Sequence, residues 1–361
     1  MLNLNKTLKR TAALLALLSL FSILAASMVS CNRTKEGGTS VILYSCSDGS
    51  GASLKRELEE GLSNLGLKYG VADAGGLENT MLAEVDMAIS KGAKTLAVEI
   101  GAGASDEAVS KVIEKAKAAD ANLILLGGNV NEQAIAGYDK CFYLGLDYES
   151  AGHSLGRLMG NYIVDNYDAI DLNGDGKIQY VMIRDEVSSE EEASYLYAIS
   201  ECNSILEENG FPPISFYDEK TSAGYLVTEA GRTAADLMKG LLSKFNEKSR
   251  TMPELAIGGN GGISMDILSA LEDIGFNRSS DKSIPVFSFE SSEDISDRID
   301  KGSVTAAVSH SAKDFSDTLI KISENLAGGK DALDGIDKDL TKGSRRVYIK
   351  SPLYPEMKDE K

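Results

Sequence analysis

Oxygen-bearing residues alternate along one short segment of the chain. Side-chain oxygens come from Asp171, Asn173, Asp175 and Gln179, and Lys177 stands in the same alternating register. Their spacing matches the first, third, fifth, seventh and ninth positions of a calcium-binding loop, where the seventh residue contributes its backbone carbonyl. Gly176 falls at the sixth position, where such a loop turns sharply. Calcium is a hard cation that prefers oxygen ligands. The pattern therefore predicts a Ca2+ site, and the alternative is a polar turn that binds no ion.

This predicted loop lacks one of its usual ligands. The twelfth position normally carries a bidentate glutamate, but Met182 stands there. Further oxygen atoms must therefore come from elsewhere in the chain. Because carboxylates that hold an ion make poor acid–base groups, the loop does not indicate an active site.

The sequence gives little support for nucleophilic catalysis. His153 and His310 are the only histidines in the chain. The alternative of a secreted glycoside hydrolase, which would use paired carboxylates, is supported only by the acidic residues. We expect a protein that is not an enzyme.

The N-terminus has the layout of an export signal. Lys6, Lys9 and Arg10 precede an apolar run over 12–29, which ends at Cys31. The small residue before this cysteine resembles a lipobox, so we expect residues 1–30 to be a signal peptide, Cys31 to be lipidated and 31–38 to form a tether. The alternative is an ordinary signal peptide with an incidental cysteine.

Charge and cysteine content exclude several functions. Removing the three positive residues of the signal changes the formal net charge from −18 to −21. Such a surface repels nucleic acid and anionic lipid head groups, so membrane contact is expected through the lipid anchor alone. Cys46, Cys141 and Cys202 have no C-x-x-C spacing, which indicates buried apolar residues rather than a disulfide framework or a zinc site.

Short apolar runs alternate with amphipathic helical stretches from residue 39 onward. Strands are predicted at 41–44, 95–100, 122–126, 179–183, 213–217, 254–257, 284–289, 303–308 and 346–349, with helices between them, for example at 54–65 and 228–242. Continuous apolar strands separated by helices indicate parallel sheets covered on both faces. The pattern restarts after Asp147. The fold class is therefore α/β, with two lobes that bind a ligand at the carboxyl ends of their strands and close by a hinge.

The loop without its twelfth ligand runs directly into the strand at 179–183, and Glu254 stands six residues before Asn260. Both features resemble the periplasmic galactose/glucose-binding proteins of ABC importers and chemotaxis, in which a distant glutamate completes the calcium site. The resemblance implies that Glu254 has this role. It also implies a type I periplasmic binding fold of two Rossmann-like lobes joined by a three-segment hinge. The expected N-terminal lobe is 39–147 plus 310–346, and the expected C-terminal lobe is 148–309 plus 347–361.

The same resemblance implies a ligand site with several departures from the family. Asp48 and Asn260 match sugar-binding residues. Four others differ: Glu99 and His310 replace asparagines, and Glu191 and Glu290 replace aspartates. No arginine or histidine occurs in 186–193, Ser50 replaces one stacking aromatic residue, and Tyr195 or Tyr225 is the candidate substitute.

These replacements change the kind of ligand that the cleft is expected to bind. Sugar sites pair hydroxyl groups with planar polar groups and stack a ring face on an aromatic side chain. Added carboxylates bring acceptors without donors, which favours a donor-rich or cationic ligand, or a sugar held differently. Alternatively, Glu99, Glu290 and His310 are solvated rim residues, and 190–192 form an exposed helix N-terminus.

The function implied is that of a monomeric, extracytoplasmic solute-binding lipoprotein that serves an ABC permease. Its expected ligand is a galactose- or glucose-like monosaccharide, and its calcium ion is structural. The alternatives are a tethered sensor for chemotaxis or a histidine kinase, and a binder of a nucleoside or a cationic solute. A cytoplasmic sugar-responsive repressor is excluded by the export signal and the lack of a helix-turn-helix.

Overall fold

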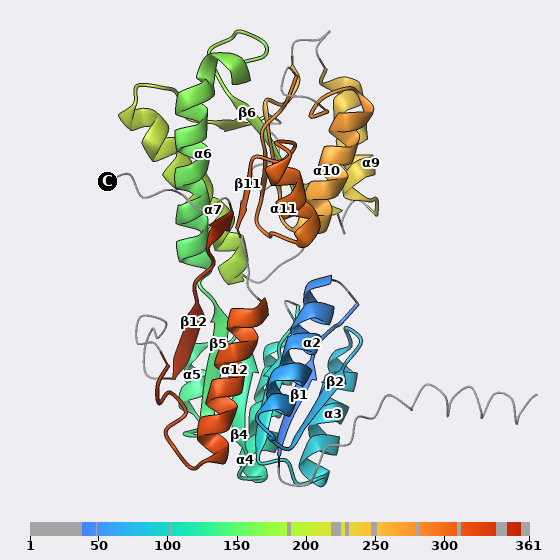
Figure 1. Cartoon of the computed structure of the whole chain (residues 1–361), viewed down its shortest axis with the longest axis vertical. Helices are drawn as coiled ribbons and strands as arrows, with labels where there is room; N and C mark the ends of the chain where they lie inside the picture. Colours follow the sequence, from blue (N-terminus) through green and yellow to red (C-terminus); the bar gives the residue numbers. More distant parts are fainter. Residues whose placement is uncertain are drawn as a thin grey trace, which may run out of the picture.

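Largely apolar runs of three to six residues form the central strands of two separate sheets. The computed structural model describes residues 38–47, 49–101, 103–185, 189–217, 225–227, 231–246, 251–278, 282–308, 312–336 and 345–354. Within these residues the two sheets lie in two lobes, one above the other in Figure 1. The predicted α/β class with parallel sheets is confirmed.

The first sheet contains six parallel strands within the described residues, in the order β12-β5-β4-β3-β1-β2. Their bounds are β1 Thr39–Leu43, β2 Tyr69–Asp73, β3 Thr95–Glu99, β4 Asn122–Leu126, β5 Cys141–Leu146 and β12 Arg346–Ile349. The helices of this lobe are α2 Gly49–Asn64, α3 Glu78–Ser90, α4 Asp106–Ala118, α5 Glu132–Ala136 and α12 Ala312–Ala327.

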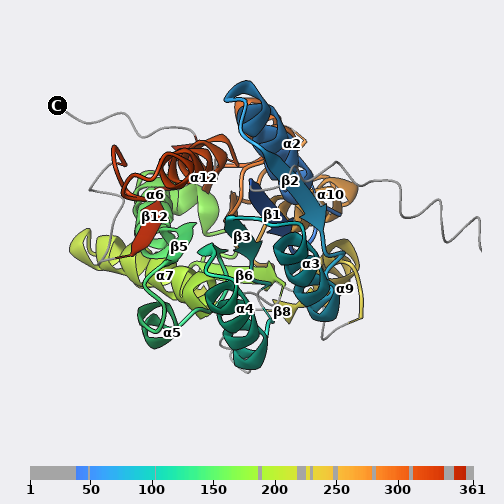
Figure 2. The same ribbon diagram turned by 90° about the horizontal axis from the view of Figure 1, so that it is seen from below.

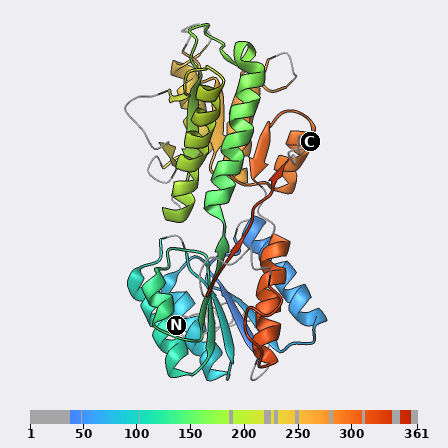
Figure 3. The same ribbon diagram turned by 90° about the vertical axis from the view of Figure 1, so that its left-hand side faces the viewer.

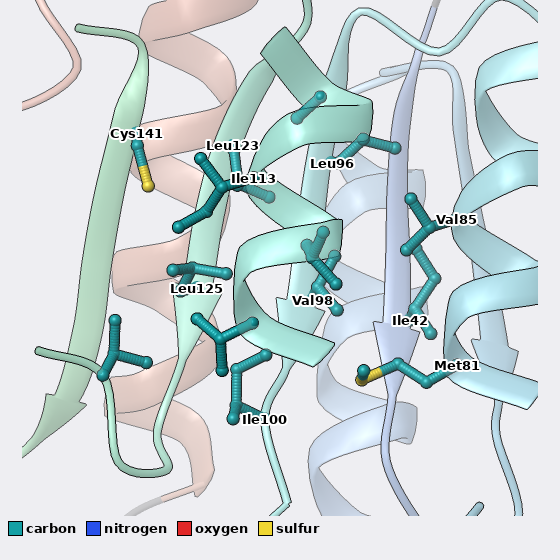
Figure 4. Close-up of a cluster of buried hydrophobic side chains, with 14 of the residues drawn as sticks. Ile42, Met81, Val85, Leu96, Val98, Ile100, Ile113, Leu123, Leu125 and Cys141 are labelled. Atoms are coloured by element: carbon teal, nitrogen blue, oxygen red, sulfur yellow. The ribbon is translucent and has the colours of Figure 1, made fainter. Parts of the chain in front are cut away.

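Both faces of this sheet are buried, because successive side chains of a strand point to opposite faces. Ile42 packs in the core on one face, with the helices α3 and α4. Its neighbours Val41 and Leu43 pack in the core on the other face, with α2 and α12. Figure 4 shows the first of these cores, and Figure 2 shows the two pairs of helices on opposite sides of the strands. The buried strands explain why their sequences read as continuous apolar runs.

The second sheet has the order β13-β11-β10-β9-β6-β7, with β8 beside β6. Its strands are β6 Gln179–Arg184, β7 Ser215–Phe216, β8 Tyr225–Leu226, β9 Leu255–Gly258, β10 Val286–Ser288, β11 Ala306–Val308 and β13 Leu353–Tyr354. Only β13 is antiparallel to its neighbour among the described pairs. The helices are α6 Tyr148–Ile170, α7 Ser189–Glu208, α9 Ala234–Lys244, α10 Gly261–Asp273 and α11 Glu293–Asp300.

One boundary predicted from the sequence is wrong. We expected 347–361 in the C-terminal lobe, but β12 pairs along its whole length with β5 of the first sheet. Val347 and Ile349 are buried in the core of that lobe, which holds the strand there. The chain then crosses to the other lobe, where Leu353 and Tyr354 pair with β11. Figure 3 shows this segment running from one lobe to the other.

The close packing of α6 against α7 depends on small residues. A Cβ on Gly156 of α6 would lie 2.5 Å from the carbonyl oxygen of Ala198 on α7. This helix pair lies on one face of the second sheet. The start of α7 lies at the hinge end of the lobe, near the cleft residues.

Candidate functional site

The carboxyl ends of the parallel strands in both lobes meet at one cavity. The cavity has a volume of about 440 Å3 and is lined by residues of both lobes. Tyr44 directly follows β1 and Glu99 ends β3, while Asn260 follows β9 and Glu290 follows β10. Ligand sites of open parallel sheets lie at such strand ends, and a volume of this size is typical of a small-molecule site, which ranges over about 300–1,000 Å3.

Glu99 forms the polar part of the N-terminal wall. Its Oε2 accepts a hydrogen bond of 2.6 Å from the backbone N–H of Tyr44. A charged acceptor makes this a strong bond, and it fixes the start of the segment after β1. Asp48, predicted in the same segment, lies outside the described residues.

Asn260 joins two elements of the C-terminal wall. Its Oδ1 accepts a 2.8 Å hydrogen bond from the N–H of Ile263 and so caps α10, and its Nδ2 donates a 2.9 Å bond to Oδ2 of Asp185. Glu290 approaches the same helix end, because its Oε2 accepts a 3.3 Å bond from the N–H of Gly261. The positive end of the helix dipole favours a carboxylate there.

Glu191 completes the group of cavity-lining carboxylates. Burial and the charges of Glu290 and Asp185 together raise its pKa to about 7, against the opposing effects of a hydrogen bond from Tyr148 and the charge of Arg184. Glu191 and Glu290 therefore lie close enough to influence each other, although they come from α7 and from the segment after β10. The structure thus brings together four of the six predicted ligand residues, while Asp48 and His310 lie outside the described part.

Sequence reasoning missed most of the aromatic wall. Tyr44, Tyr148, Phe289 and Phe315 line the cavity. Tyr195, which we considered as a stacking residue, lies behind this wall with its ring centroid 4.5 Å from that of Phe289. The side chain of Tyr225 lies outside the described residues. Only Phe289 could have been predicted to line the cavity from the sequence, because it stands at a strand end and directly precedes Glu290.

Arg184 was also missed, because the expected arginine was sought further along the chain. It is the last residue of β6, is buried, and donates a 2.8 Å hydrogen bond to Oε1 of Glu192. Its guanidinium lies 5.6 Å from the ring centroid of Tyr195. Arg184 therefore supports the C-terminal wall from behind.

The predicted calcium loop lies at the opposite end of β6, directly after α6. Asp171 accepts hydrogen bonds from the N–H groups of Gly174, at 2.8 Å, and Gly176, at 2.9 Å. Both glycines have φ above +70°, a left-handed conformation that glycine adopts without strain. The loop is thus curled around its first carboxylate.

Glu254 reaches this loop from the start of β9. Its Oε1 accepts a 3.2 Å bond from the N–H of Asn173, and its Oε2 accepts a 3.1 Å bond from the N–H of Gln179. The side chain is fully buried. Burial and, to a smaller extent, the charges of Asp171 and Asp175 raise its pKa to about 7, although the two backbone hydrogen bonds lower it. The juxtaposition predicted for Glu254 and the loop is therefore present.

The donor set of this loop fits calcium chemistry, since it combines carboxylate oxygens with the amide oxygens of Asn173 and Gln179. Across the described residues, however, no group of three or more His, Cys, Asp or Glu side chains is arranged to hold a metal ion. The carboxylates of the loop instead accept hydrogen bonds from backbone N–H groups. Calcium binding therefore stays a prediction.

Two α/β lobes with parallel strands and a cavity between them define a two-lobed binding protein. The sequence profile of the periplasmic binding protein domain matches residues 40–331. The chain belongs to this family. Members of the family are solute-binding proteins without enzymatic activity, so the prediction of a non-enzyme is confirmed.

Individual relatives cover most of the chain. The D-galactose/methyl-galactoside binding periplasmic protein MglB of Haemophilus influenzae is 26% identical over 304 residues, which span 83% of this chain and 84% of that protein. An ABC transporter periplasmic solute-binding protein of Actinobacillus succinogenes, solved with D-allose, has a TM-score of 0.65 at 14% identity and covers 88% of this chain and 97% of its own. A Mycobacterium smegmatis protein solved with β-D-fucofuranose has a TM-score of 0.62 at 14% identity. The match covers 87% of this chain and 90% of that chain.

The predictions for the N-terminus concern residues that lie outside the described part of the chain. These are the signal peptide, the tether and the lipidation of Cys31. In the described residues, no helix is both long and apolar enough to cross a bilayer.

We predict that Asn260→Asp lowers the stability at pH 7, although aspartate is also a good helix cap. The substitution replaces an N–H donor with a second carboxylate against Asp185, at a cost of about 1–3 kcal/mol. Because a proton taken up by the new pair of carboxylates removes their repulsion, the loss should diminish as the pH falls. Thermal unfolding between pH 7 and pH 4 measures this effect.

The matched control is Asn260→Ser, which retains a capping oxygen and adds no charge. Its smaller loss of stability should not depend on pH in this range. An aspartate variant as stable as the wild type at pH 7 would contradict the contact with Asp185.

Proposed function

We propose that this protein is the solute-binding lipoprotein of an ABC importer and captures a galactose- or glucose-like monosaccharide between its lobes. The observation that carries the proposal is the cavity of about 440 Å3, which is lined by carboxylates, an amide and aromatic rings from both lobes. Aromatic faces and planar polar groups are the two elements of a sugar site. The names of the galactoside-binding and D-allose-bound relatives support the same class of ligand.

Binding and lobe closure are coupled in this account. The chain passes between the lobes after β5, after β11 and after β12, so the lobes are connected at the hinge and able to move at the cleft opening. A solute that contacts Glu99 in one lobe and Asn260 or Glu290 in the other favours the closed form. The permease would recognise that closed form.

Attachment to the membrane would come from the N-terminus. Lipidation of Cys31 would place a monomeric protein on the outer face of the cell membrane or in the periplasm, with 31–38 as the tether. The formal charge of −21 for the chain from Cys31 onward supports contact through the lipid rather than through an anionic membrane surface.

We also propose that the loop holds a structural Ca2+ ion. The residues that would bind it are Asp171, Asn173, Asp175, Lys177, Gln179 and Glu254. The buried carboxylate of Glu254 supports this proposal, because a buried anion is costly unless it is paired. A cation there would stabilise the start of β9, the strand that ends next to Asn260.

A monosaccharide ligand should raise the melting temperature. A ligand that binds only the folded state stabilises it by about 2.7 kcal/mol at 100 times its Kd. The measurement is thermal unfolding with D-galactose, D-glucose, D-allose and their amino derivatives at millimolar concentration. Glu99→Ala should weaken the shift, whereas Glu114→Ala, at an exposed site on α4, should leave it unchanged. A complete absence of shifts across the panel would reject the sugar assignment.

Calcium should stabilise the wild-type protein relative to the same protein in a chelator. Glu254→Gln should lose most of this gain, because the amide removes the buried charge that would face the ion. Lys177→Ala is the matched control, since this residue would contribute only its backbone carbonyl, and its calcium response should persist. An undiminished response of Glu254→Gln would refute the role of Glu254.

A further inference from the structure

The described part of the cavity wall is strongly one-sided in charge. It contains Glu99, Glu191 and Glu290, and no lysine, arginine or histidine is among the described residues that line the cavity. Just behind the C-terminal wall lie Asp185 and Glu192, and Arg184 is the cation next to them. The C-terminal side thus combines four carboxylates with one guanidinium.

Glu191 and Glu290 meet in this wall from two different elements. The negative charge of Glu290 is the largest electrostatic influence on the carboxyl group of Glu191 after burial itself. Two neighbouring carboxylates in a partly buried site oppose each other's ionisation. A cation between them would remove this repulsion.

A buried hydroxyl group lies beside the same wall. Tyr195 is 4% exposed, and its Oη has no hydrogen-bond partner within the described residues. The Oη lies 3.2 Å from the point that a Cβ would occupy on Gly259, a residue that lines the cavity. Burial raises the pKa of Tyr195, and the charge of Glu191 raises it further. Tyr195 does not line the cavity, so its hydroxyl adds polarity behind the wall and is not assigned to the solute.

We propose that the solute carries a protonated amine, and that Glu191 and Glu290 bind it; the ligand class is then an amino sugar. The inference rests on the proposed function, because the sugar ring is assigned to the aromatic walls. An ammonium group has three N–H donors and no acceptor. It therefore complements a wall of acceptors better than a sugar hydroxyl does, which needs both donors and acceptors.

Isothermal titration calorimetry of the full chain tests the proposal. The probes are D-glucosamine and D-galactosamine, each compared with its parent hexose at pH 7. At least one amine should bind about tenfold more tightly than its parent, equivalent to about 1.4 kcal/mol. N-acetylation of that amine, which removes the charge, should abolish the preference.

Two variants separate the amine subsite from general damage to the cleft. Glu290→Gln keeps an oxygen for the N–H of Gly261 but loses the charge, so it should bring the amine and its parent hexose to equal affinity. Glu208→Gln, at the exposed far end of α7, should retain the preference.

The outcomes distinguish a failure of the amine subsite from a failure of the proposed sugar binding. If the hexoses bind and neither amine binds more tightly, the amine subsite is refuted while sugar binding stands. A preference that persists in Glu290→Gln would also refute it. If neither hexoses nor amines bind, both the amine subsite and the sugar function are refuted.

Discussion

The parallel direction of the strands is the constraint on which the site depends. In both lobes the central strands run toward the hinge, so the residue after each strand reaches the same cavity. Glu99 ends β3, and Asn260 and Glu290 follow β9 and β10. A shift of one residue in strand register would turn these side chains to the opposite face of their sheets. The apolar cores on both faces of each sheet prevent such a shift, because they fix which residues are buried.

A second constraint connects the predicted calcium loop to the cleft through a single short strand. Glu254 directly precedes β9, and Asn260 lies two residues after it. Because β9 lies between β6 and β10 in the sheet, an ion bound at the start of the strand would act on the position of Asn260 only through rigid, buried structure. The loop and the cleft are therefore separate sites on one scaffold, and the ion would stabilise without contacting the solute.

The sequence predicted those features that depend on local pattern. Continuous apolar runs identified the buried strands, and the spacing of Glu254 and Asn260, read by resemblance to a family, placed one at the loop and the other in the cleft. The contact of Asn260 with Asp185 was not predictable, since these residues are 75 positions apart and their contact depends on how β6 and β9 align. The lobe to which β12 belongs was predicted wrongly, because nothing in a strand of four residues with alternating burial indicates which of the two sheets it joins. The aromatic wall was not predictable from the sequence either, because its residues come together only through the relative position of the two lobes.

Capture of a monosaccharide between two closing lobes is the central claim of this account. Small-angle X-ray scattering tests it most directly, with separate titrations of D-galactose and D-glucosamine into the purified mature protein. The account predicts that the radius of gyration decreases with at least one of these sugars and saturates as the sites fill. A radius of gyration that stays constant through both titrations would contradict it.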